Sequence, residues 1–76
     1  MDALTKKIFK KVFGKKIKID INSDINSIYF WDSLNHIRLI DEIEKTIKKK
    51  LSITQVIHLT SVKKINSLLK KNEKKI

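Results

Sequence analysis

The chain has no cysteine and no proline, and only one of its 76 residues is glycine. Without cysteine, disulfides, thiolate metal ligands and a cysteine nucleophile are excluded. The scarcity of turn-forming residues disfavours β architectures that are rich in turns. No apolar run approaches the roughly 20 residues that cross a bilayer, and no secretory signal pattern is present. We therefore expect one small domain, spanning residues 1–76, in the cytoplasm.

Arginine is almost absent, although the chain is strongly basic. Lys and Arg number 18 against 8 Asp and Glu, a net charge of +10, and all but one of these cations are lysine. Arginine is the residue that grips phosphates and reads bases through a bidentate fork, so its scarcity weakens a nucleic-acid interpretation. The net charge is +4 over residues 1–31, −3 over 32–44 and +9 over 45–76. An acidic segment thus separates two basic ones.

Apolar residues at helical spacing predict three main helices and a short one. The prediction is an all-α fold, a small four-helix bundle with a long loop after the first helix, and a tail over 72–76 that frays. The first helix is expected to be capped by Asp2 and to end at Phe13, before Gly14. The second should run from Asp32 or Ser33 to about Lys48. A short helix capped by Thr54 and a last helix capped by Thr60 or Ser61 should follow.

Residues 15–31 have a different pattern. Ile17, Ile19 and Ile21 alternate with polar residues, which is typical of a strand, but no second β pattern follows with which a strand could pair. We therefore expect a partly extended loop that packs its later isoleucines, Ile25 and Ile28 among them, on the helices. Loops longer than about 12 residues are uncommon in compact domains and are often functional.

The most specific motif, Trp31-Asp32-Ser33-Leu34, stands where the second helix is expected to begin. A serine at this position is by itself an ordinary helix cap. Trp31 either packs the loop against the helices or shapes the entrance to a pocket. Leu34 projects from the polar face of the helix, so it is either an incidental surface residue, one covered by the loop, or an apolar contact for a partner protein.

With the segments that follow it, WDSLNHIRLIDEIEKTI and LTSVKKINSLL, the sequence resembles the acyl carrier protein family, which includes the peptidyl carrier domains. The resemblance covers nearly the whole chain. It implies that Ser33 is the attachment site of 4′-phosphopantetheine, transferred from coenzyme A by a separate phosphopantetheinyl transferase. It also implies that Asp32 caps the helix or contacts the transferase and its metal. The thiol of the prosthetic group then holds an acyl or aminoacyl group as a thioester.

The resemblance further implies a monomeric carrier without catalytic activity, which acyl- or aminoacyl-loading and acyl-transfer enzymes act on. Its expected partner contacts are Leu34, Arg38, Asp41 and Glu42. Candidates to line an acyl pocket, and equally to be plain core residues, are Ile37, Ile40, Ile57 and Leu59. Asn35 and Arg38 stand where fatty-acid carriers are commonly acidic, which predicts a specialised stand-alone carrier rather than one for bulk fatty-acid synthesis.

The two histidines, His36 and His58, do not predict an enzyme or a metal centre. A Ser33–His36 pair would lie on one helix with no third group to orient the imidazole. Two histidines also fall short of the three or four ligands of a zinc site, so no metal is expected. The alternative interpretation is a basic helical protein that binds nucleic acid or an anionic membrane through its first and last helices, which leaves the Asp-Ser-Leu motif unexplained.

Overall fold

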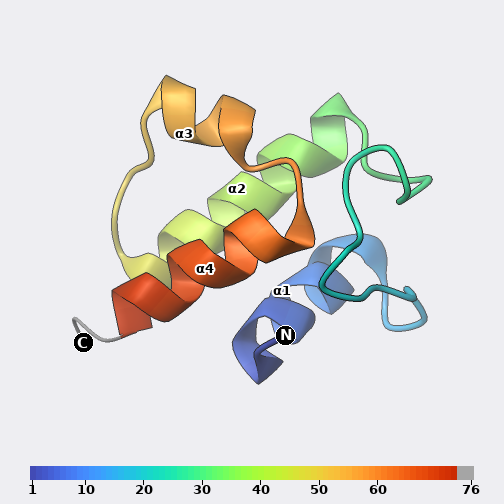
Figure 1. Cartoon of the computed structure of the whole chain (residues 1–76). Coiled ribbons are helices and arrows are strands. Elements are labelled where there is room, and N and C mark those ends of the chain that lie inside the picture. Colours follow the sequence, from blue (N-terminus) through green and yellow to red (C-terminus); the bar gives the residue numbers. More distant parts are fainter. Residues whose placement is uncertain (74–76) are drawn as a thin grey trace.

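The computed structural model describes residues 1–73, within which it has four helices and no strand: α1 (Ala3–Phe13), α2 (Ser33–Ile47), α3 (Ile53–His58) and α4 (Val62–Glu73) (Figure 1). α1 packs against α2 and α4, and α2 packs against α4. In Figure 1, α2 and α4 run in the same direction and α1 in the opposite one, with α3 lying across the top. The predicted all-α fold is confirmed. Of the tail expected to fray over 72–76, the first two residues end α4 and the last three lie outside the described residues.

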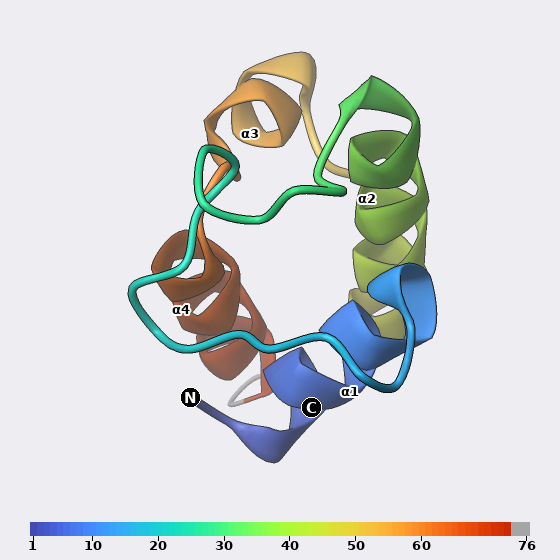
Figure 2. The same cartoon turned by 90° about the vertical axis from the view of Figure 1, so that its right-hand side faces the viewer.

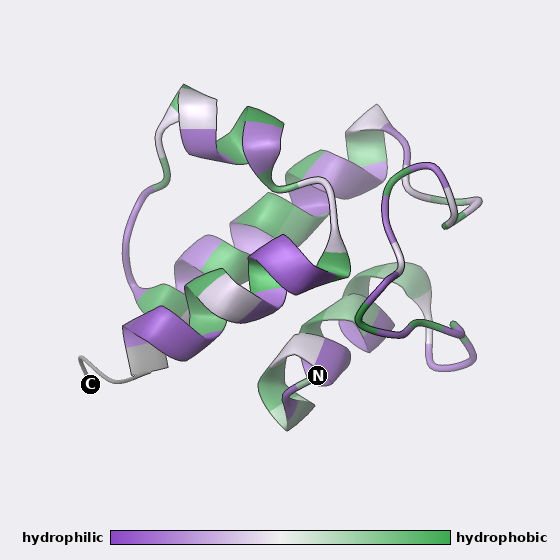
Figure 3. Ribbon diagram, viewed as in Figure 1, coloured by the Kyte–Doolittle hydropathy of each residue, from purple (hydrophilic) through white to green (hydrophobic). Residues whose placement is uncertain are grey.

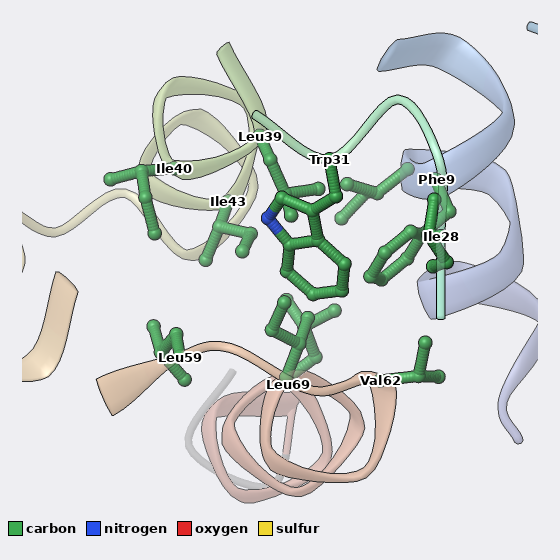
Figure 4. Packing of buried hydrophobic residues seen from close by; sticks show 11 residues of the cluster. Phe9, Ile28, Trp31, Leu39, Ile40, Ile43, Leu59, Val62 and Leu69 are labelled. Carbon is green, nitrogen blue, oxygen red and sulfur yellow. The ribbon is translucent and has the colours of Figure 1, made fainter. Parts of the chain in front are cut away.

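One hydrophobic cluster holds these helices together. Both polar and apolar residues occur on every helix, as Figure 3 shows, and the apolar ones face inward. The indole of Trp31 lies in the middle of the packing in Figure 4, between α1 on one side and α2 on the other. The buried members are Ile8, Phe9, Ile28, Trp31, Leu39, Ile40, Ile43, Leu59, Val62, Ile65 and Leu69.

Local hydrogen bonds fix where the helices begin and end. The Asp32 carboxylate accepts the backbone N–H of Asn35 at 2.9 Å and so caps α2. The Ser61 hydroxyl accepts the N–H of Lys64 at 3.2 Å at the start of α4. Gly14 follows α1 with a φ of 104°, a conformation that favours glycine. Of the two caps predicted for each of these helices, the structure therefore uses Asp32 rather than Ser33 for α2 and Ser61 rather than Thr60 for α4.

Of the other predicted caps, Asp2 holds the N-cap position of α1 without a side-chain bond, and Thr54 is wrong. The Asp2 side chain makes no capping bond, and its backbone N–H instead donates to Asn66 Oδ1 at 2.8 Å. Thr54 lies inside α3, which begins one residue earlier and is capped by Ser52. The Ser52 hydroxyl accepts the N–H of Gln55, whose side chain in turn accepts the N–H of Ser52. This reciprocal capping box takes precedence because it satisfies two N–H groups, where Thr54 alone would satisfy one.

The 15–31 loop is ordered by two similar turns. Asp20 accepts the N–H of Asn22 at 2.7 Å, and Asp24 accepts that of Asn26 at 2.9 Å, as in Asx turns. Residues 23–25 then pair with 60–62 through two backbone hydrogen bonds of 2.9 Å, which form an isolated antiparallel bridge. Figure 2 shows the loop crossing the face between α1, α3 and α4. The predicted packing of its isoleucines is confirmed, with Ile28 buried in the core.

A buried polar contact joins α1 to α4. Thr5 is fully buried, and its hydroxyl donates to Asn66 Oδ1 at 2.8 Å. The same oxygen accepts the backbone N–H of Asp2. One side chain on α4 therefore satisfies two donors at the start of α1.

Replacing Asn66 should destabilise the protein. In Asn66→Ala the buried hydroxyl of Thr5 loses its acceptor, and an unsatisfied buried donor costs about 1–3 kcal/mol. The free energy of unfolding, measured by urea denaturation, should fall by that amount. Ser67→Ala, at the exposed next position of α4, is the matched control and should change it by no more than about 0.5 kcal/mol. Equal effects of the two substitutions would contradict a role for this contact.

Candidate functional site

Ser33 lies exposed at the first position of α2. The preceding residue, Asp32, is also exposed, and its carboxylate is engaged by the N–H of Asn35. The unpaired N–H groups and the dipole at a helix N-terminus favour negative charge nearby. A phosphate ester on the Ser33 hydroxyl would therefore lie in a favourable field, which the carboxylate of Asp32 partly opposes.

The backbone before Ser33 forms a tight corner. The carbonyl oxygen of Phe30 accepts two bonds, from the N–H of Asp32 at 3.0 Å and from Nδ2 of Asn35 at 2.8 Å. The N–H of Trp31 donates to the carbonyl of Ile28 at 3.1 Å. These bonds tie the end of the loop to the first turn of α2. Ser33 is thus presented from a fixed corner.

Trp31 anchors this corner in the core. It is 4% exposed, and its ring packs edge-on against Phe9 with centroids 5.4 Å apart. Its Nε1–H donates to Nδ1 of His36 at 2.9 Å, and Nε2 of His36 lies 2.8 Å from the carbonyl oxygen of Val56 on α3. An indole nitrogen only donates, so Nδ1 accepts, and the imidazole proton resides on Nε2 and is donated to Val56. The packing role of Trp31 is thereby established.

His36 is the site residue whose role the sequence did not indicate. The sequence assigned it no catalytic or metal-binding role, and in the structure its ring links the loop, α2 and α3 through the two bonds above. Its ring also stacks on Trp31 with centroids 6.0 Å apart. The five-residue separation from Trp31 was the available signal, but the bond to α3 depends on a chain reversal that spacing alone does not predict.

The four residues expected to contact partners differ in accessibility. Leu34, Arg38 and Asp41 are exposed on α2. The Glu42 side chain is only 19% exposed, because it forms an ion pair of 3.1 Å with Lys11 of α1. Leu34 and Arg38 are accessible to a partner, and so is Asp41 although it pairs with Lys45. Glu42 contributes to the contact between α1 and α2.

Lysines neutralise the acidic side chains of α2. Besides the Glu42 pair, Asp41 pairs with Lys45 at 3.2 Å, and Glu44 lies 3.8 Å from Lys50. The hydrogen bond that Lys45 donates to Asp41, then the charges of Asp41 and Glu42, raise the pKa of Lys45. Exposed pairs of this kind contribute little to stability. Lysines thus lie beside three of the four carboxylates of residues 32–44.

The four candidates for an acyl pocket are divided between the core and the surface. Ile40 and Leu59 are each 7% exposed and belong to the core cluster, whereas Ile37 is 65% and Ile57 62% exposed. The structure therefore does not bring the four together on one cavity. Ile37 shares the helix with core residues, but it follows His36 at the edge where α3 approaches α2.

Large apolar side chains are exposed on both α2 and α3. Leu34 and Ile37 on α2 are 66% and 65% exposed, and Ile53 and Ile57 on α3 are 77% and 62% exposed. The bond between His36 and α3 holds these two elements together. Sequence reasoning singled out Leu34 and missed Ile53, because the short helix was expected to begin after it.

Comparison of the chain with protein-family models, curated proteins and solved structures found no match. None of the helices in residues 1–73 is long and apolar enough to cross a bilayer. The same part of the chain contains no group of three or more histidine, aspartate or glutamate residues that could hold a metal ion. A proposal about function therefore rests on the sequence motif and on the geometry around Ser33.

Removing the imidazole of His36 should loosen the corner that presents Ser33. In His36→Ala the buried Trp31 Nε1–H loses its acceptor, which costs about 1–3 kcal/mol of unfolding free energy. Chemical denaturation followed by Trp31 fluorescence measures the change. His58→Ala is the control, since His58 is exposed at the end of α3, and it should shift stability by at most about 0.5 kcal/mol. A loss no larger for His36 than for His58 would refute the assigned role.

Proposed function

We propose that this chain is a stand-alone acyl carrier protein that bears 4′-phosphopantetheine on Ser33 and carries an acyl or aminoacyl group as a thioester. The observation that supports this most is the exposed Ser33 of the Asp-Ser-Leu motif at the first position of α2. A long loop before the motif and a short helix before the last one complete the pattern that resembles the carrier family. The chain itself performs no catalysis in this proposal.

The residues around Ser33 fit the prosthetic group. In the modification, Ser33 Oγ loses its proton and bonds to the phosphorus of the pantetheine phosphate, and the adenosine bisphosphate part of coenzyme A leaves. The α2 N-terminus favours the phosphodiester formed. Asp32 holds the first turn of α2 through Asn35 and stays exposed to a transferase. When bound, the group supplies the thiol that holds the cargo.

The surface beside Ser33 suits partner enzymes that recognise apolar side chains. Leu34 and Ile37 are exposed on the same helix, and Arg38 adds a positive charge where fatty-acid carriers are commonly acidic. Because like charges across an interface cost several kcal/mol, a partner adapted to an acidic helix fits this surface poorly. We therefore propose a specialised biosynthetic pathway, in the cytoplasm, served by a monomeric carrier.

Modification of Ser33 is the direct test. Incubation with coenzyme A and a broad-specificity phosphopantetheinyl transferase should add the mass of one phosphopantetheine group to the intact protein. Ser33→Ala should abolish the shift, whereas Ser67→Ala, which removes an exposed serine from α4, should leave it unchanged. No shift with folded protein and an active transferase would overturn the proposal.

Loading with malonyl groups tests the specialised role. Because Asn35 and Arg38 replace acidic residues, a malonyl transferase of bulk fatty-acid synthesis should load the holo protein much more slowly than an acidic carrier. The difference should be on the order of tenfold or more in kcat/KM, the effect of about 1.4 kcal/mol of charge mismatch. Rates that match those of the acidic carrier would place the protein in bulk synthesis.

A further inference from the structure

Two aromatic side chains at the end of the 15–31 loop are exposed side by side. The sequence has five aromatic residues, and Phe9, Phe13 and Trp31 pack together in or against the core. Tyr29 and Phe30, by contrast, are 91% and 60% exposed, with ring centroids 4.9 Å apart. The bonds to the Phe30 carbonyl fix the backbone at this point, so the pair is presented from an ordered corner.

A groove runs beside this aromatic pair. It has a volume of about 710 Å³, and Phe13, Ile17 and Ile28 give it an apolar floor. Tyr29 and Phe30 line it from one segment, and the turn after α1 lines it from the other. In Figure 1 both segments lie at the right-hand end of the molecule, away from the C-terminus of α4.

Every charged residue that lines the groove is a lysine. Lys15, Lys16 and Lys18 stand on the turn after α1. A second hollow of about 740 Å³ shares Lys15 and Gly14 with the first, and its remaining charged residues are also lysines, on the outer face of α1. The aromatic pair therefore borders a series of lysines that extends from the turn onto α1, of which Lys11 is paired with Glu42. A partner that matches this face in charge and polarity is an extended anionic surface that also contains hydrocarbon.

We propose that this aromatic–lysine face docks the protein on anionic lipid bilayers. Aromatic rings are favoured at the level of the headgroups, where Tyr29 places its ring in the apolar region and its hydroxyl in the polar one. Lysines near the surface are attracted by anionic headgroups, and their apolar stems lie along hydrocarbon. The apolar floor of the groove then meets acyl chains rather than water. Docking is peripheral and needs no spanning helix.

The arrangement of the rings favours a bilayer over single-stranded nucleic acid. Nucleic-acid platforms offer ring faces on which successive bases stack. The planes of Tyr29 and Phe30 are 86° apart, so the edge of one ring covers a face of the other. The positive charges beside them are lysines, which do not form the bidentate fork that grips phosphates. An apolar floor has no counterpart in a sugar–phosphate backbone.

The face does not depend on the chemistry of Ser33. It lies before Trp31 and Asp32 in the chain, and its residues take no part in the modification proposed above. Failure of phosphopantetheine attachment and failure of bilayer docking are therefore separate results. Ser33→Ala should bind vesicles as the parent protein does.

Co-sedimentation of the full chain with lipid vesicles tests the proposal. Binding is expected to phosphatidylcholine vesicles that contain phosphatidylglycerol, and not to phosphatidylcholine alone. Tyr29→Ser/Phe30→Ser should lower the partition coefficient roughly tenfold, since two rings no longer insert. Lys15→Gln/Lys16→Gln/Lys18→Gln should lower it on the order of a hundredfold.

Two matched variants separate this face from general stickiness. Ile53→Ser/Ile57→Ser removes two exposed apolar side chains from α3, and Lys63→Gln/Lys64→Gln/Lys70→Gln removes three lysines from α4. The α3 variant should bind vesicles like the parent protein. The α4 variant should lose far less affinity than Lys15→Gln/Lys16→Gln/Lys18→Gln. Circular dichroism verifies that all variants fold.

Three results would overturn the proposal. The first is the absence of binding to anionic vesicles. The second is equal loss of binding from the loop and α4 lysine variants, which would mean unspecific attraction by net charge. The third is binding of a single-stranded oligonucleotide, without vesicle binding, that weakens in Tyr29→Ser/Phe30→Ser.

Discussion

The packing and hydrogen bonding of one indole connect most parts of this small fold. Trp31 contacts Phe9 of α1 with its ring and His36 of α2 with its nitrogen, and His36 passes the connection on to Val56 of α3. A domain of this size buries only about 60% of its unfolded surface, so each large buried side chain carries a large share of the stability. The chain has a single tryptophan, and it stands directly before the candidate site. The position of Ser33 is thus fixed by core packing rather than by contacts of its own.

The same constraint explains why the long loop can be ordered. Seventeen residues without a helix would be costly to fix, because each ordered residue loses about 1–2 kcal/mol of backbone entropy. Ile28 and Trp31 offset part of this loss by burial, and the pairing with residues 60–62 satisfies backbone groups in the middle. Tyr29 and Phe30 stand in the chain between these two buried residues, Ile28 and Trp31, and their own side chains are exposed. Their exposure follows from the anchoring of the loop.

The helices could be predicted from the sequence because their signals are local. Periodicity and caps located α1, α2 and α4, and Gly14 marked the end of α1. Contacts between residues that are far apart in the sequence could not be predicted from such local signals. The link from His36 to α3 and the pair between Lys11 and Glu42 join residues whose proximity only the tertiary packing creates. The exposure of Ile37 has the same origin, because helical periodicity shows which residues share a face and not whether another element covers that face.

The fold also changes how the charges around the candidate site are interpreted. In the sequence, the segment after Ser33 is the acidic part of a basic chain. In space, lysines of α1, of α2 itself and of the following turn lie against its carboxylates. What α2 offers to solvent near Ser33 is then Leu34, Ile37 and Arg38. If the protein is a carrier, long-range attraction between opposite charges contributes little to recognition at this helix, and affinity rests on apolar contact. Such recognition is short-ranged and insensitive to salt, so it selects partners by the shape of their binding groove.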